Sequence, residues 1–74
     1  MNLHALRVFY TVAKLGSFSG AAEALCISQP AVSKALKELE HQLNIQLIER
    51  ASKGKKLTLS EGGQALYDHA RSIF

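Results

Sequence analysis

The fold is decided by residues 28–43, which read SQPAVSKALKELEHQL. Ser28 can cap a helix, and Pro30 is tolerated behind it because first-turn amides need no intrahelical partner. Apolar side chains then recur at helical spacing and form one stripe. The sequence predicts a helix that runs to about Gln42 before a turn at Asn44, with a buried stripe made of Val32, Leu36, Leu39 and Leu43.

The opposite face of this predicted helix is polar, and its charge changes along the helix. Glu38 and Glu40 occupy the C-terminal half, where they would repel a phosphate. The N-terminal half carries no acid, and the start of a helix presents free amides to an anion. This half therefore suits a polyanion, and its offered side chains are Gln29, Pro30, Ser33, Lys34 and Lys37.

Further elements are expected on both sides of this helix. Apolar spacing predicts a helix over about residues 3–15, capped by Asn2 and ended by Gly16, and a short helix at about 18–25, capped by Ser17 or Ser19. Short strands are expected around Leu47–Ile48 and Leu57–Leu59, with Gly54 at the turn between them. Ser60 can cap a last helix, whose pattern still runs at the chain end, so we expect a fragment of a longer protein.

Three helices followed by a two-stranded hairpin describe a winged helix-turn-helix, a mainly α fold. Ala22 would supply the small side chain where the second and third helices cross, and Val32 would pack beneath the third. Cys26 stands at the tight turn, where many such motifs place glycine. We expect residues 1–59 to form this domain and residues 60–74 to begin a linker and dimerisation helix.

The distribution of charge favours a nucleic-acid partner. The 74 residues carry nine Lys and Arg against six Asp and Glu, a formal net charge of +3. Residues 27–37 and 50–56 together hold six of those bases and none of the acids. Two basic segments on an otherwise acidic body suit a polyanion with a defined docking side, such as nucleic acid, whereas ordinary solvated faces are the alternative interpretation of charge alone.

Side-chain chemistry suggests individual roles. Gln29 can pair with adenine or otherwise donate and accept at base edges, Ser33 suits a base or a phosphate, and Lys34 can reach guanine acceptors or the backbone. The alternatives are a mere first-turn position for Gln29 and a mere ion pair of Lys34 with Glu38. The bases of the hairpin would contact backbone phosphates or, alternatively, protect an exposed edge strand; they are Arg50, Lys53, Lys55 and Lys56.

Catalysis and metal binding find no support in the sequence. A chain this short buries only about 60% of its unfolded surface, which leaves no room for a deep substrate cavity, and we do not expect an enzyme. His4, His41, His69 and Cys26 fall on different predicted elements at no metal-ligand spacing, so neither a metal nor another cofactor is expected in this domain.

The single cysteine and the lack of long apolar runs indicate a cytoplasmic location. Cys26 cannot form an internal disulfide, and we expect it to be a small buried or half-buried residue, the alternative being a thiol redox switch. No apolar run approaches the roughly 18 residues of a membrane span, and residues 1–7 lack the pattern of a signal peptide.

The last predicted helix carries an apolar stripe that three helices and a hairpin need not cover completely. Its residues are Leu66, Ala70 and Ile73. Because an exposed stripe favours a partner, we expect a homodimer that reads inverted-repeat half-sites. The rival function is a winged helix that contacts another protein instead of DNA.

The segment QPAVSKALKELE, with its flanks, resembles the N-terminal DNA-binding domain of LysR-type transcriptional regulators over essentially the whole chain. The matching residues are Leu6, Phe9, Gly16–Phe18, Ala21–Ala22, Leu25, Ser28–Ser33, Leu39–Glu40 and Leu47–Arg50. The resemblance implies a bacterial repressor or activator that binds double-stranded DNA and dimerises through a linker helix. It also implies a small-molecule effector for a C-terminal domain absent from this chain, and leaves a higher oligomer open for the full-length protein.

The resemblance implies site residues as well. Gln29, Pro30, Ser33 and Lys34 match positions that meet DNA in the recognition helix. The start of the bracing helix, which lies along the DNA backbone, is matched by Ser17, Phe18 and Ser19, and the wing by Arg50 and Lys53. Lys34 stands where the family most often has arginine, and Gly62 adds a glycine before the usual one at Gly63.

Overall fold

The computed structural model describes residues 2–50 and 57–74, and the elements found there follow the predicted order. The mainly α fold of three helices, a two-stranded hairpin and a further helix is confirmed. The elements are α1 (Leu3–Leu15), α2 (Phe18–Leu25), α3 (Gln29–Leu43), β1 (Ile48–Arg50), β2 (Thr58–Leu59) and α4 (Glu61–Ile73).

Each helix begins at a side chain that satisfies a first-turn amide. Asn2 Oδ1 accepts a hydrogen bond from His4 N at 2.9 Å. The serine hydroxyls of residues 17, 28 and 60 accept from the amide three residues further on. Ser17, not Ser19, is therefore the cap of α2. The first three helices end at residues with left-handed backbone, which turn the chain sharply: Gly16, Cys26 and Asn44.

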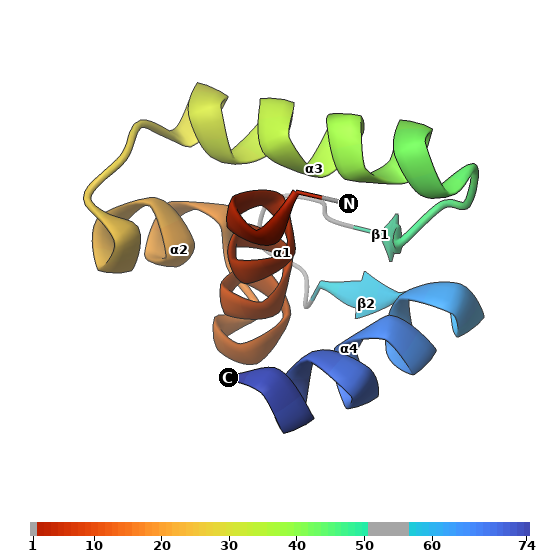
Figure 1. Cartoon of the computed structure of the whole chain (residues 1–74). Coiled ribbons are helices and arrows are strands. Elements are labelled where there is room, and N and C mark those ends of the chain that lie inside the picture. The colour runs from red at the N-terminus through yellow and green to blue at the C-terminus, as the bar shows by residue number, and fades with distance from the viewer. Residues whose placement is uncertain (1, 51–56) are drawn as a thin grey trace.

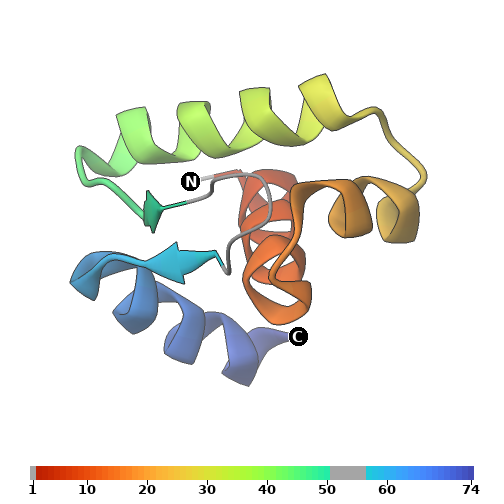
Figure 2. The same cartoon turned by 180° about the vertical axis from the view of Figure 1, so that it is seen from behind.

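The core lies where α1 meets the other helices. In both views α1 passes between α3 on one side of the molecule and α4 on the other (Figures 1 and 2). Of the predicted stripe on α3, Val32, Leu36 and Leu39 are buried, whereas Leu43 is partly buried. The largest fully buried side chains are Val8, Phe9, Val12, Val32, Leu39 and Leu47.

The hairpin follows α3 and packs between α3 and α4. β1 and β2 pair antiparallel, with Ile48 opposite Leu59 and Arg50 opposite Thr58, and the register is irregular between these two pairs. In Figure 1 the hairpin lies at the C-terminal end of α3, and α2 lies at the N-terminal end. The turn predicted at Gly54 lies outside the described residues.

The predicted apolar stripe on α4 does not form a continuous exposed surface. Ala70 is fully buried in the core of its own chain, and Leu66 packs partly buried against that core. Ile73 is 59% exposed. The stripe is therefore incompletely covered, as expected, but Ala70 is not part of its exposed side.

The expected environment of Cys26 is also wrong. Its side chain is exposed rather than buried or half-buried. Its backbone is left-handed, with a φ of 58°. At the apex of the turn between α2 and α3, this conformation leaves its side chain in solvent.

Candidate nucleic-acid interface

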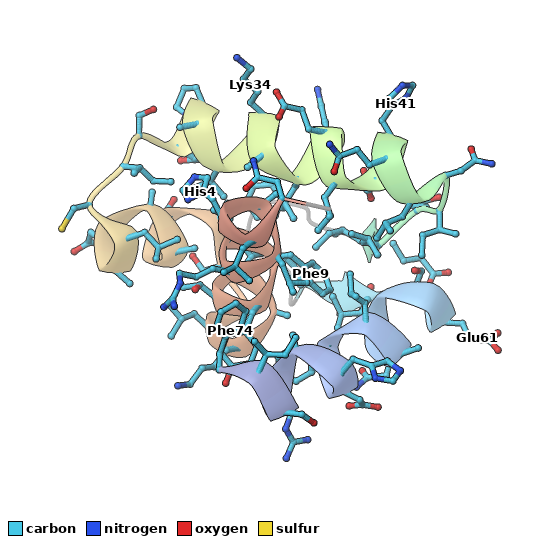
Figure 3. The ribbon with its side chains drawn as sticks, viewed as in Figure 1. His4, Phe9, Lys34, His41, Glu61 and Phe74 are labelled. Carbon is cyan, nitrogen blue, oxygen red and sulfur yellow. The ribbon has the colours of Figure 1, made fainter. Side chains whose placement is uncertain are left out.

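The face of α3 opposite the core presents the polar side chains that the sequence singled out. Gln29, Pro30, Lys34 and Lys37 are exposed, and Ser33 is half-buried. Figure 3 shows Lys34 and, further along α3, His41 projecting on the side turned away from α1. The predicted division of α3 into a buried apolar side and an offered polar side is confirmed.

Few backbone amides at the start of α3 remain free for an anion. Pro30 has no N–H group, and the amide of Ala31 donates to Ser28 Oγ at 3.2 Å. The amide of Val32 already donates to the Ser28 carbonyl oxygen at 3.2 Å. Contacts of this end of α3 with a phosphate must therefore come mainly from side chains. The free first-turn amides that the sequence suggested for binding an anion are few.

The turn between α2 and α3 is closed by backbone hydrogen bonds. The amide of Cys26 donates to the Glu23 carbonyl oxygen at 3.2 Å, and the amide of Ile27 donates to the Ala22 carbonyl oxygen at 3.0 Å. Ala22 is 8% exposed and Val32 is completely buried, as expected for the crossing of these two helices. The turn and the crossing together hold α2 in one position against the N-terminal half of α3.

A side-chain hydrogen bond, not predicted from the sequence, links the two helices at their exposed edge. Ser19 Oγ donates to Gln29 Oε1 at 3.2 Å. The sequence contains an indication of this contact, because Ser19 and Gln29 are ten positions apart, the same separation as the crossing pair Ala22 and Val32. Ser19 therefore lies beside the first residue of α3.

The other two residues expected at the start of α2 contribute to the fold. The Ser17 hydroxyl accepts from Gly20 N at 2.9 Å as the N-cap. Phe18 is partly buried and packs against the core. Contact of either one with DNA stays a prediction.

Glu40 has a structural role that sequence reasoning missed. Its Oε2 atom accepts hydrogen bonds from the amides of Leu47 and Ile48, at 2.7 and 3.4 Å. Asn44 reverses the chain after α3, so these amides return beside the carboxylate. Glu40 thereby fastens the hairpin to α3 and is half-buried, whereas Glu38 is exposed.

The basic residues of the predicted wing are not placed relative to this face. Arg50 ends β1, and Lys53, Lys55 and Lys56 lie outside the described residues. Within residues 2–50 and 57–74, no three His, Cys, Asp or Glu side chains are grouped so that they could hold a metal ion. No helix in the described part of the chain is long and apolar enough to cross a membrane.

The fold and the offered face of α3 define a winged helix-turn-helix DNA-binding domain. The family model for the bacterial regulatory helix-turn-helix proteins of the lysR family matches residues 3–64. The chain belongs to this family.

Similar proteins include two bacterial HTH-type transcriptional regulators. An uncharacterized HTH-type transcriptional regulator of Azotobacter vinelandii is 45% identical over 73 residues, which are 99% of this chain and 49% of the relative. The HTH-type transcriptional activator CmpR of Synechocystis is 41% identical over 72 residues, which are 97% of this chain and 23% of the relative. The chain thus spans half or less of the length of these two regulators.

A solved structure gives the same backbone arrangement. The DNA-binding domain of BenM in complex with benA site 1 DNA has a TM-score of 0.89 and 38% sequence identity. The match covers 99% of this chain and 80% of that one.

Proposed function

We propose that this domain binds duplex DNA sequence-specifically, with the N-terminal half of α3 in the major groove. The observation that carries the proposal is the exposed polar row on α3, in which Gln29, Lys34 and Lys37 point away from the buried stripe. Such side chains read base edges by hydrogen bonds, and lysines add attraction to phosphate. The DNA complex of the similar BenM domain supports the proposal.

Selection of binding sites from random duplexes is the first test of this proposal. It is expected to enrich one motif with two inverted half-sites at helical-turn spacing. Recovery of no motif, together with binding that does not change with salt, would favour the rival function of protein contact.

The base-reading residues can then be tested singly on the selected site. Gln29→Ala and Lys34→Ala should each weaken specific binding by about 1–3 kcal/mol, because each removes a base-edge contact. Fluorescence anisotropy titrations with the selected duplex and with a random duplex distinguish a loss of base recognition from a general loss of DNA affinity. An equal loss of affinity on random DNA after Gln29→Ala would contradict base recognition.

We propose further that the hairpin bases Arg50, Lys53, Lys55 and Lys56 neutralise backbone phosphates. Lys55→Ala or Lys56→Ala should then weaken binding to all duplexes alike and lower the slope of log K against log salt by about one for each lost contact. A slope that keeps its wild-type value in both variants would count against these contacts.

Dimerisation through α4 is also proposed, with residues 60–74 as the start of a linker helix and residues 1–59 as the DNA-binding unit. The support is the exposed apolar side chain of Ile73 at the end of α4, together with the partly buried Leu66; Ala70 would support the helix from inside. Light scattering of a chain that contains α4 should give a dimer at micromolar concentration, and only monomer would contradict the proposal. We propose that any small-molecule effector binds outside this domain and that the domain itself needs no cofactor.

A further inference from the structure

The contact between Ser19 and Gln29 is made by a hydroxyl that the fold does not otherwise need for capping. Ser17 already caps α2, with its Oγ atom 2.9 Å from Gly20 N. Ser19 is exposed at the second position of the helix, where its hydroxyl donates to Gln29 Oε1 at 3.2 Å. Because both residues are exposed, this bond adds little to the core, and its consequence lies in the orientation of the Gln29 amide.

Gln29 is the first residue of the helix that carries the proposed interface. A glutamine amide has an acceptor, Oε1, and a donor, Nε2, on opposite sides of one carbon, so its orientation decides which group a base meets. The Ser19 hydroxyl engages Oε1 from the α2 side. The Nε2 hydrogens are then the groups left to turn away from α2, toward a ligand of α3.

The backbone around Ser19 and Gln29 is held in place by hydrogen bonds. Movement of the two helices therefore does not average out the orientation of the Gln29 side-chain amide. Cys26 and Ile27 close the turn between α2 and α3 by hydrogen bonds to Glu23 and Ala22. Pro30 fixes the backbone φ directly after Gln29. The separation between Ser19 and Gln29 is consequently set by the fold.

We propose that Ser19 is a positioning residue that makes Gln29 a hydrogen-bond donor at the base edge. The preferred base would then carry an acceptor in the major groove, namely guanine through O6 and N7 or thymine through O4. Bidentate pairing with adenine is disfavoured, since it requires Oε1 to face the adenine amino group beside Nε2. This inference rests on the proposed function, the reading of duplex DNA by α3.

A double-mutant cycle tests the inference on the site selected by the wild-type protein. Ser19→Ala should weaken specific binding about threefold to tenfold, the range of one neutral hydrogen bond, and weaken random-duplex binding less. In the Gln29→Ala background the same change should have no effect. Ser19→Thr keeps the hydroxyl and should restore most of the affinity, while Ser72→Ala, an exposed serine on α4, is the matched control.

Base preference provides the second readout. The base pair read by Gln29 is the one whose selectivity is lost in Gln29→Ala. Wild-type protein should select a G·C pair there, or an A·T pair at which 2-aminopurine, which lacks the major-groove amino group, replaces adenine without loss of affinity. Ser19→Ala should lose affinity on that replacement, because Gln29 Oε1 is then free to accept from the adenine amino group. Unfolding midpoints of all the variants should match the wild type, because Ser19 and Gln29 are exposed.

The contrary outcomes separate this inference from the proposed function. An equal loss from Ser19→Ala with and without Gln29 would show that Ser19 contacts DNA itself and would overturn the positioning role. Loss of wild-type affinity when 2-aminopurine replaces adenine at that pair would overturn the donor orientation. If the wild type selected no motif at all, the proposed function would fail, and this inference would fail with it.

Discussion

At the scale of single residues, three residues near Leu47 decide how the C-terminal part of the chain closes on the helices. Gly63, in the first turn of α4, lies so close to Leu47 that an added Cβ would overlap its carbonyl oxygen. Glu40 binds the amide of the same residue at 2.7 Å. Ser60 also bonds here, since its hydroxyl donates to the carbonyl oxygens of Gln46 and Leu47. Leu47 is fully buried, so polar groups and a core side chain meet at one point.

Gly63→Ala is expected to lower the free energy of unfolding by about 2–3 kcal/mol, because α4 must move away from the Leu47 backbone. Urea denaturation of Gly62→Ala provides the comparison. A Cβ at Gly62 meets the flexible end of Ile45, at 3.1 Å from Cδ1, and alanine favours the helix, so no loss is expected there. Equal losses of unfolding free energy in the two variants would show that the close approach of Gly63 to the Leu47 backbone does not cause the loss.

Glu40→Ala should lower the free energy of unfolding by about 1–3 kcal/mol, since a partly buried amide loses its charged acceptor. Glu38→Ala removes the same charge from an exposed position of α3. This variant should change the free energy of unfolding by less than about 0.5 kcal/mol. The measurement is chemical denaturation at neutral pH. If both variants behaved alike, Glu40 would act only through its charge and not through its hydrogen bonds.

At the scale of elements, the turn between α2 and α3 sets the geometry of the helix-turn-helix unit. Cys26 holds a φ of 58°, a region that favours glycine and is costly for branched side chains. The amides of Cys26 and Ile27 donate hydrogen bonds to carbonyl oxygens near the C-terminal end of α2. The unit therefore accepts a non-glycine residue at a cost in backbone strain.

Substitutions at Cys26 should reveal this strain. Cys26→Val is expected to lower the free energy of unfolding by about 1–2 kcal/mol, because a β-branched side chain opposes the left-handed backbone. Cys26→Gly relieves the strain and should match or exceed the wild type by up to about 1 kcal/mol. Thermal unfolding under reducing conditions ranks the three proteins, and a glycine variant less stable than the valine variant would contradict this account.

At the scale of the whole molecule, α4 belongs to the same packed body as the helices that precede it. The rings of Tyr10 and Tyr67 stack at 5.5 Å, and Phe74 lies 5.5 Å from the Tyr10 ring. The Arg7 guanidinium stands 4.6 Å from the centre of the Phe74 ring. Figure 3 shows Phe74 lying over α1 at the end of α4. These aromatic contacts, with buried Ala70, fix the direction of α4 relative to α1.

Tyr67→Ala should loosen this attachment and lower the free energy of unfolding by about 1–3 kcal/mol, because a partly buried ring and its stacking are lost. Amide hydrogen exchange should accelerate along α4 more than along α3. His69→Ala, at an exposed position of α4, is the matched control and should leave both quantities unchanged. Uniform acceleration in α3 and α4 would mean that the aromatic contacts do not act on α4 alone.

Short-range patterns explain why so much of the fold could be predicted from the sequence. The serine and asparagine caps, the left-handed residues Gly16 and Asn44, and the apolar stripe of α3 act within one or two helical turns. The offered side of α3 follows from the same periodicity, so Gln29, Lys34 and Lys37 could be predicted as exposed. The direction of α4 could not, because its apolar residues fit either an intermolecular contact or the core of this chain.

The sequence by itself determined the order of elements, the approximate boundaries of the helices and the polar half of α3, since spacing and capping act between near neighbours. The strands begin one residue later than expected, at Ile48 and Thr58. Only the tertiary structure decided that Ser19 meets Gln29, that Glu40 holds the returning chain and that Ala70 faces inward. These contacts depend on how separate helices cross and pack. A helix pattern states which side is apolar, but the partner of that side is chosen by packing across the whole molecule.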